Sequence, residues 1–177
     1  LRILDIPNLV TLEARCANLE GTGEITIREL IRTALRMRPN RIIVGEVRGA
    51  EAIDMLQALN TGHDGSLSTG HANSPKDMLS RLESMVLMGM DLPLGAVQRQ
   101  IASGIDIIVH LGRLRDKSRK VLEVSEILDY QDGEILVSPL YRFEETGEKD
   151  GKIQGTWRKM DDLVHTQKLL AAGYKEV

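Results

Sequence analysis

Two side chains that can carry acid–base or metal chemistry each stand at the end of a run of apolar or small residues. Glu46 follows the run 41–45, RIIVG, and His71 closes the run 65–71, GSLSTGH. A carboxylate in such a position suits a hard cation such as Mg²⁺, held directly or through water. An imidazole can donate a hydrogen bond to a terminal phosphate. Together the two groups are typical of phosphoryl transfer, in which catalysis consists mostly of positioning and charge stabilisation.

These two side chains can share a site only if the runs before them are neighbouring parallel strands. The run 41–47, RIIVGEV, is predicted to be a short strand with apolar residues on both faces, as in a central strand covered by helices. A helical pattern precedes this run, behind a capping box formed by Thr26 and Glu29. The alternation of strand and helix over 1–112 predicts an α/β fold, with a mainly parallel sheet flanked by helices. Both candidates would then lie at the carboxyl ends of strands, where ligands bind in such folds.

Each candidate also has an ordinary structural interpretation. A glutamate at a strand end is most often solvated, and a histidine there is most often a surface residue. His63, Asp64 and His71 match no zinc-ligand spacing, so metal ligation by histidine is disfavoured. The four arginines within 32–41 suit either a solvated helix face or contacts to phosphate or to a neighbouring subunit.

The composition excludes several classes of protein. The chain has 177 residues, of which 42% are apolar and 28% charged, which is typical of one globular domain or of a domain with an appendage. A formal charge of −3 gives no indication of nucleic-acid binding. No apolar run approaches the ~20 residues that span a bilayer, so membrane association is expected to come through a partner. Cys16 is the single cysteine, which fits a reducing cytosol.

The pattern changes after residue 112. Apolar runs on both sides of Asp132 and Gly133, a strong turn signal, predict an antiparallel hairpin over 120–143. The charged and glycine-rich segment 144–156 is predicted to be a loop. The remaining predictions are a strand over 8–15, helices over 49–62, 75–89, 94–104 and 159–172, and a strand over 105–111.

A nucleotide-binding P-loop is missing from these residues. The pattern Gly-x-x-x-x-Gly-Lys-Ser/Thr does not occur, and the segment that starts at Gly147 has the wrong spacing. We therefore expect the chain by itself to bind nucleotide weakly or not at all. Because the sequence starts without Met and in the middle of a pattern, we expect a fragment, with a partial α/β domain over 1–130 and a C-terminal extension over 131–177.

The two chemically suggestive runs and their surroundings resemble the type II/type IV secretion ATPase superfamily. RMRPNRIIVGEVRGAEA resembles the Walker B region of that family, and TGHDGSLSTGHANS resembles its His box. The similarity is closest to the Tad/Flp pilus assembly ATPases, the CpaF-like branch. It is carried by EGTGEITIRELIRTALRMRP, MLSRLESMVLMGMDLP and IASGIDIIVHLGRLRDKSRKV.

The resemblance implies a partial RecA-like P-loop NTPase core that works as a hexameric ring at the cytoplasmic face of a membrane. ATP and Mg²⁺ are the implied cofactors, and inner-membrane platform proteins of a pilus or secretion machine are the implied partners, with no nucleic acid expected. Residue by residue, it implies that Glu46 acts near Mg²⁺ and the attacking water and that His71 lies near the γ-phosphate. It also implies nucleotide contacts from Arg48 and Thr69, and a nucleotide or intersubunit contact from Arg15.

The sequence leaves three functions open. The preferred one is the C-terminal part of a motor ATPase that powers pilus assembly or protein secretion. Because the Walker A segment and the acidic Asp box of the family are missing, the alternative is a non-catalytic or degenerate RecA-like module that acts as a partner-binding scaffold. A nucleic-acid motor is disfavoured, since the charge balance supplies no basic surface.

Overall fold

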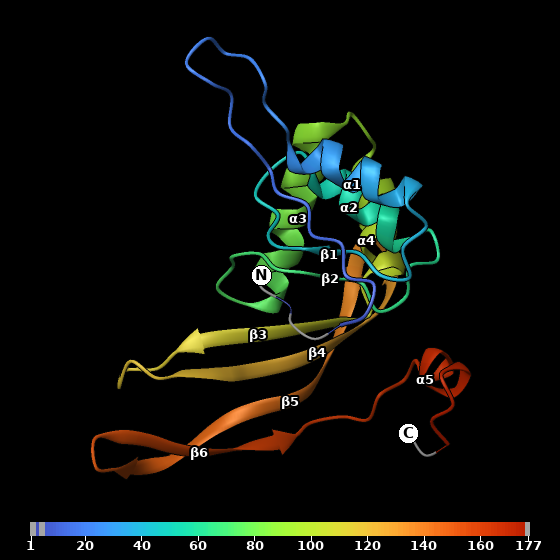
Figure 1. Ribbon diagram of the computed structural model, residues 1–177. Helices are drawn as coiled ribbons and strands as arrows, with labels where there is room; N and C mark the ends of the chain where they lie inside the picture. Colours follow the sequence, from blue (N-terminus) through green and yellow to red (C-terminus); the bar gives the residue numbers. More distant parts are fainter. Residues whose placement is uncertain (1–2, 4–5, 176–177) are drawn as a thin grey trace.

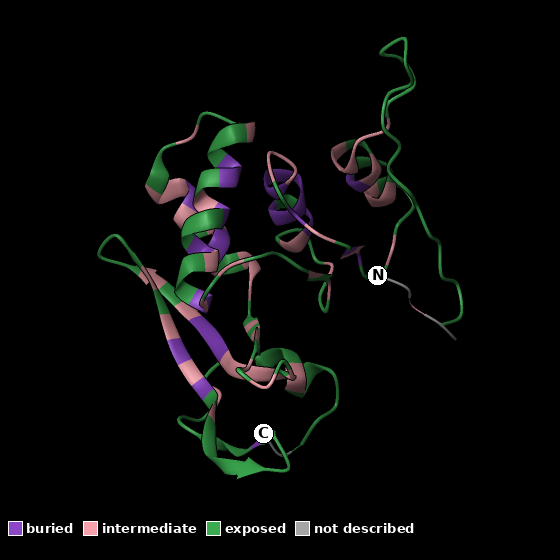
Figure 2. Cartoon of the chain, turned by 90° about the vertical axis from the view of Figure 1, so that its left-hand side faces the viewer, coloured by how far each residue is buried: buried purple, intermediate pink, exposed green. Residues whose placement is uncertain are grey.

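Helices and short strands alternate in the first part of the chain, and long strands dominate the second part (Figure 1). The structure is a computed structural model that describes residues 3 and 6–175. In chain order its elements are α1 (Ile27–Arg36), β1 (Ile43–Val44), α2 (Ala52–Leu59), β2 (Leu67–Ser68), α3 (Pro75–Gly89), α4 (Leu94–Gly104), β3 (Ile107–Arg113), β4 (Arg119–Gln131), β5 (Glu134–Lys149), β6 (Lys152–Lys159) and α5 (Gln167–Ala171). Buried residues are concentrated in the helices and in the parts of β4 and β5 nearest to them (Figure 2).

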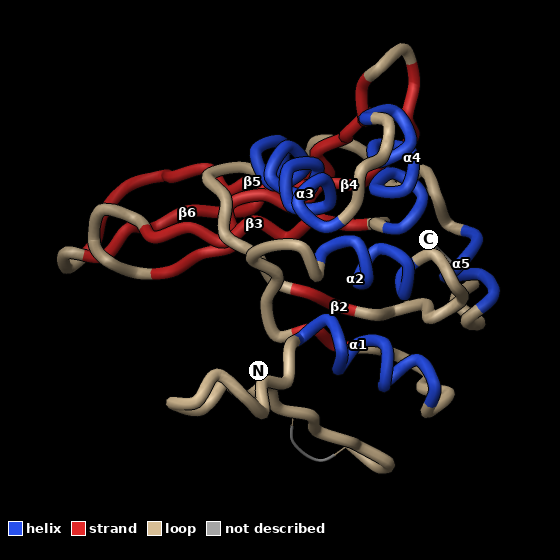
Figure 3. The backbone as a smooth tube through the Cα atoms, turned by 90° about the horizontal axis from the view of Figure 1, so that it is seen from above, coloured by secondary structure: helices blue, strands red, loops and turns tan. Residues whose placement is uncertain are grey.

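A pair of parallel strands lies among the helices. β1 pairs with β2 in the register Ile43–Leu67 and Val44–Ser68. Seen from above, this pair lies between α1 on one side and α2 on the other (Figure 3). The two runs that end in the candidate residues are therefore parallel neighbours, as the sequence analysis required, and helices cover both faces of the pair.

Local sequence signals set where the helices begin. Thr26 Oγ1 accepts a hydrogen bond from the N–H of Glu29 at 3.2 Å, and Glu29 Oε2 accepts one from the N–H of Thr26 at 2.8 Å, which confirms the capping box. Ser74 Oγ accepts from the N–H of Asp77 at 3.1 Å, and Pro75 occupies the first position of α3. None of the helices in the described part of the chain is long and apolar enough to cross a lipid bilayer.

The prediction of a mainly parallel sheet is not confirmed. Among the described residues only β1 and β2 pair in parallel, whereas the four-stranded sheet, in the order β3-β4-β5-β6, is antiparallel throughout. The predicted strand over 105–111 forms as β3, but its partner is the next strand along the chain. A tight turn, in which the N–H of Leu114 donates to Ser118 O at 2.9 Å, joins β3 to β4. Strands joined by so short a turn pair antiparallel, because a parallel pair needs a long crossover connection.

Two Asp-Gly turns close the other hairpins of this sheet. Asp132 and Gly133 have φ angles of 53° and 89°, and Asp150 and Gly151 have φ angles of 52° and 69°. Positive φ at two successive residues is the requirement of a type I′ turn, whose twist matches that of paired strands. The first hairpin was predicted correctly. The prediction of a loop over 144–156 was wrong, because the second Asp-Gly pair joins β5 to β6 there.

Two further predicted elements differ from the structure. Residues 8–15 contain no regular strand, and the only pairing in that segment is an isolated bridge between Arg15 and Ile25. The helix predicted over 159–172 is confined to α5. Part of the segment before α5 donates its backbone N–H groups to the carboxylate of Glu126 on β4, so those groups do not form helical hydrogen bonds.

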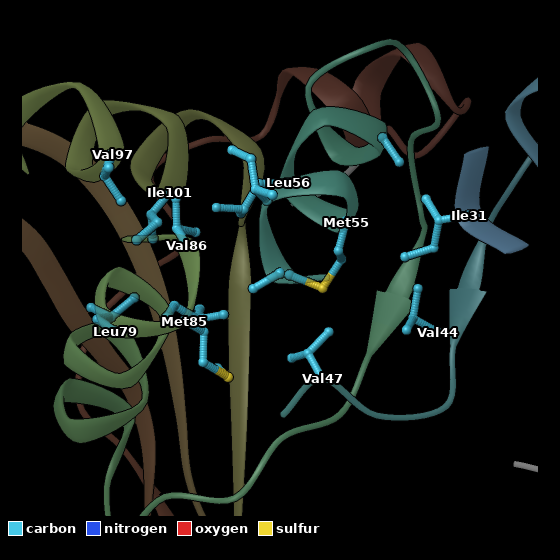
Figure 4. Close-up of a cluster of buried hydrophobic side chains, with 14 of the residues drawn as sticks. Ile31, Val44, Val47, Met55, Leu56, Leu79, Met85, Val86, Val97 and Ile101 are labelled. Atoms are coloured by element: carbon cyan, nitrogen blue, oxygen red, sulfur yellow. The ribbon is translucent and has the colours of Figure 1, made fainter. Parts of the chain in front are cut away.

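One hydrophobic core connects the parallel pair to the antiparallel sheet (Figure 4). The core includes Ile31 of α1, Val44 of β1 and Ile127 of β4. The large aliphatic side chains with the least exposure are Ile53, Leu56, Val86, Val97 and Ile101. Because protein interiors are close-packed, this core fixes β1 relative to the helices and to β4.

Candidate functional site

Glu46 and His71 are in contact at the carboxyl ends of β1 and β2. His71 Nε2 lies 2.8 Å from Glu46 Oε1. The Glu46 side chain is mostly shielded, with 21% of its surface exposed, whereas that of His71 is 82% exposed. The expected juxtaposition is therefore confirmed, and the chemical roles of the two residues stay predictions.

Thr69 holds the ends of the two strands together. The N–H of Val47 donates to Thr69 O at 3.0 Å, and Thr69 Oγ1 donates to Gly45 O at 2.5 Å. These bonds continue the parallel pairing past both strands and lie on either side of Glu46 in the chain. The hydroxyl proton of Thr69 is thus used on the backbone, so the residue positions the site, and its predicted nucleotide contact stays a prediction.

Arg48 pairs with Glu46 and favours its charged form. Arg48 Nη2 lies 2.5 Å from Glu46 Oε2. The hydrogen bond from Arg48 is the main cause that holds the pKa of Glu46 below its ordinary value, and the same bond to Glu46 raises the pKa of Arg48. Glu46 is therefore ionised at neutral pH.

Glu51 fixes the backbone of this arginine, and the sequence analysis missed it. Glu51 Oε1 accepts from the N–H of Arg48 at 2.6 Å and from the N–H of Gly49 at 3.1 Å. No local signal marked this role, because the Glu51 side chain does not cap α2 and instead binds the backbone N–H groups that precede it. Glu51 thus orders the turn that presents Arg48 to Glu46.

Glu46 alone matches the ligand requirement of Mg²⁺ in this site. Its Oε1 is buried, and His71 Nε2 does not align with it as a hydrogen bond, so this oxygen lacks a hydrogen-bond partner within the described residues. The described chain also contains no cluster of three or more His, Cys, Asp or Glu side chains able to hold a metal. Mg²⁺ keeps several waters and uses one or two carboxylates together with substrate phosphates. A single carboxylate therefore fits a magnesium ion that arrives with a nucleotide.

A polar hollow opens beside His71. Its volume is about 610 Å³, within the range of ligand sites. His71 and Asn73 lie at its edge, and Ser80 and Arg81 of α3 line its wall. Hydroxyl, amide, imidazole and guanidinium groups thus line the space next to the exposed histidine, together with the carboxylate of Asp77.

Arg15 lies apart from the Glu46–His71 pair. Arg15 Nε donates to Gly23 O at 2.7 Å, and the residue lines a second hollow of about 390 Å³ together with Glu51. Within the described residues no hydrogen bond or ion pair joins Arg15 to the pair. Its predicted contact to nucleotide or to another subunit stays a prediction.

Comparison with known proteins gives the class to which this fold and site belong. The chain belongs to the type II/IV secretion system protein family, whose model matches residues 8–159. This membership confirms the broad resemblance to secretion ATPases, while the Tad/Flp branch stays a prediction.

This chain aligns with only part of the length of each relative. The putative conjugal transfer protein Rv3659c of Mycobacterium tuberculosis is 46% identical over 129 residues, which are 73% of this chain and 36% of that protein. The conjugal transfer protein TrbB of Rhizobium radiobacter is 35% identical over 127 residues, 69% of this chain and 38% of that protein. The chain therefore spans little more than a third of these relatives.

A solved structure supports the fold directly. The VirB11 ATPase from the Brucella suis type IV secretion system, in complex with sulphate, aligns with a TM-score of 0.54 and 36% identity. The alignment covers 56% of this chain and 31% of that one. The chain thus contains part of a VirB11-like α/β fold.

Proposed function

We propose that the protein to which this chain belongs is a motor ATPase that hydrolyses ATP to power pilus assembly or protein secretion. The observation that carries the proposal is the contact of Glu46 with His71 at the carboxyl ends of neighbouring parallel strands. This is the position at which open α/β folds bind their ligands. The similarity to a VirB11 ATPase supports the same reaction.

Each residue of the site has a role that its surroundings support. Glu46, whose pKa is held below its ordinary value by Arg48, would hold Mg²⁺ through water and would orient the attacking water. Magnesium, when bound with ATP, supplies positive charge that neutralises the phosphates. His71, exposed beside the polar hollow, donates a hydrogen bond to an oxygen of the terminal phosphate. Arg48, whose side chain is 77% exposed, exchanges Glu46 for a phosphate oxygen as its partner when the nucleotide binds.

The proposal includes the number of copies that assemble and the partners that they bind. Six copies form a ring at the cytoplasmic face of the inner membrane, bound to platform proteins of the pilus or secretion machine, as the resemblance to the Tad/Flp branch implies. The phosphate-binding loop comes from outside these 177 residues, because they contain no P-loop motif. The chain alone is expected to be inactive. Mass photometry of the full-length protein with ATP would measure the number of copies.

The proposal is tested by substitution of His71. We expect Mg²⁺-dependent ATP hydrolysis by the full-length protein, and a fall in kcat of about 10- to 100-fold in His71→Asn, because one hydrogen bond to the developing charge is lost. The KM for ATP should change by less than about threefold, since the imidazole contacts only the terminal phosphate. Phosphate release would be measured, with His110→Asn on β3 as the matched control. Equal kcat for His71→Asn and wild type would contradict the role of His71, and a wild type without hydrolysis would contradict the whole proposal.

The pairing of Arg48 with Glu46 predicts a pH effect. A lowered pKa keeps Glu46 ionised as the pH falls, so activity should persist in mildly acidic solution. In Arg48→Ala the pKa of Glu46 in the free enzyme returns towards its ordinary value, and the acid limb of the pH profile of kcat/KM, which reports the free enzyme, should move to higher pH. Arg48→Ala also lowers the overall rate, so the diagnostic quantity is the midpoint of the acid limb. An unmoved acid limb would show that the ionisation of Glu46 does not set it.

A further inference from the structure

We propose that residues 160–171 form a strap that positions His71 for catalysis. The strap fastens the antiparallel sheet to the turn that leads into β2, the strand that ends near His71. In Figure 1 the chain leaves β6, continues beyond the sheet and leads into α5. The effect on turnover rests on the function proposed above, whereas the mechanical coupling rests on the contacts alone.

A buried carboxylate anchors the middle of the strap. Glu126 on β4 is 1% exposed. It accepts hydrogen bonds from the N–H groups of Val164 at 2.9 Å and His165 at 2.8 Å, and His165 Nδ1 lies 3.0 Å from the same carboxylate. Nearby, Ser138 Oγ donates to Asp161 Oδ2 at 3.0 Å. A buried carboxylate that lost these donors would be strongly destabilising, so this part of the strap stays docked on the sheet.

Lys168 anchors the far end of the strap to two different segments. Its Nζ lies 2.8 Å and 2.9 Å from the two carboxylate oxygens of Asp106, directly before β3, and 3.1 Å from Oδ1 of Asp64, between α2 and β2. Burial acts against the charge of Lys168, but the hydrogen bonds to Asp106 and Asp64 outweigh it and raise the pKa of the lysine. The ammonium therefore stays charged and connects the C-terminal sheet to the turn that contains Asp64.

That turn is bonded to the start of the parallel pair. The N–H and Oγ of Ser66 both donate to His63 O, at 3.2 Å and 2.7 Å, and close the turn. The N–H of Ile42 donates to Ser66 Oγ at 2.9 Å, and the N–H of Leu67 donates to Ile42 O at 3.1 Å. Displacement of the turn therefore shifts β2 against β1, and with it the segment that carries His71.

The main effect of Lys168 is on the position of the turn and of His71, and its contribution to the stability of the fold is small. Its side chain is 53% exposed and that of Asp64 is 67% exposed, and ion pairs so accessible to water contribute little to folding. The buried anchor at Glu126 keeps the strap docked without the lysine. A small misplacement of a catalytic group nonetheless lowers turnover strongly. Lys168 is thus a positioning residue for His71.

The test uses the full-length protein and substitutions of Lys168. In Lys168→Ala, amide hydrogen exchange of residues 60–71 should become faster by about fivefold or more, because the turn opens more often. The kcat should fall by about three- to tenfold with an unchanged KM for ATP. The thermal midpoint should stay within about 2 °C. Lys168→Arg should restore both exchange and kcat, and Lys175→Ala, an exposed lysine beyond α5, is the matched control.

A double substitution separates the contact of Lys168 with Asp64 from its contacts with Asp106. Asp64→Asn should reproduce part of the effect of Lys168→Ala, and the combined variant should be no worse than Lys168→Ala alone, because both changes break the same bond. Unchanged exchange of 60–71 in Lys168→Ala would overturn the coupling. Faster exchange with unchanged kcat in an active enzyme would overturn the positioning role. If the wild type does not hydrolyse ATP, the function proposed above fails, and the exchange data still decide whether the strap holds the turn.

Discussion

ATP turnover by the full-length protein is expected to fall by about 10²- to 10⁴-fold when Glu46 is replaced by Gln. This loss corresponds to roughly 3–5.5 kcal/mol of transition-state stabilisation. Glutamine has the same shape, but it is neutral and carries an NH₂ group in place of one acceptor oxygen. It neither attracts a hydrated magnesium ion nor takes a proton from water, and it no longer forms an ion pair with Arg48.

Binding of ATP should persist in the same variant. The interactions that Glu46 supplies are needed chiefly in the transition state, so the Kd for a fluorescent ATP analogue should stay within about threefold of wild type. Glu134→Gln, at the exposed first residue of β5, is a matched control and should keep full activity. Undiminished hydrolysis by Glu46→Gln would contradict the catalytic role, and loss of ATP binding in it would assign Glu46 to ground-state binding instead.

The free energy of unfolding should fall by about 2–5 kcal/mol in Leu56→Ala. Leu56 is 0% exposed and lies in the core among α2, α3 and α4 (Figure 4). Truncation to alanine removes apolar contacts and leaves a cavity that the close-packed surroundings fill only in part. Urea unfolding followed by circular dichroism would measure the change as a lower midpoint with an unchanged slope.

Leu87→Ala provides the matched comparison for this prediction. Leu87 also lies in a helix, but it is 42% exposed, so its truncation should change the free energy of unfolding by no more than about 0.5 kcal/mol. Equal losses for the two variants would contradict the assignment of the core to the region around Leu56. A loss below about 1 kcal/mol in Leu56→Ala would show that the helices repack around the cavity.

Features that depend on neighbours in the chain were predicted from the sequence. The capping box of Thr26 and Glu29 and the type I′ turn at Asp132 and Gly133 involve groups only a few residues apart. The second Asp-Gly pair carried the same signal, but the surrounding charged and glycine-rich residues suggested a loop. In such cases the residues themselves supply the donors, acceptors and permitted backbone angles, so a local pattern is sufficient.

For Glu46 and His71, the sequence and the tertiary structure determined different features. The sequence by itself determined that Glu46 and His71 stand at the ends of strand-forming runs, and the family resemblance pointed to the same two residues. Only the tertiary structure decided that these runs are adjacent, that β3 pairs with β4, and that Glu51 and Lys168 brace the site. The reason is physical: strand partners and long-range ion pairs depend on how a shared core brings distant segments together, and no single segment contains that information.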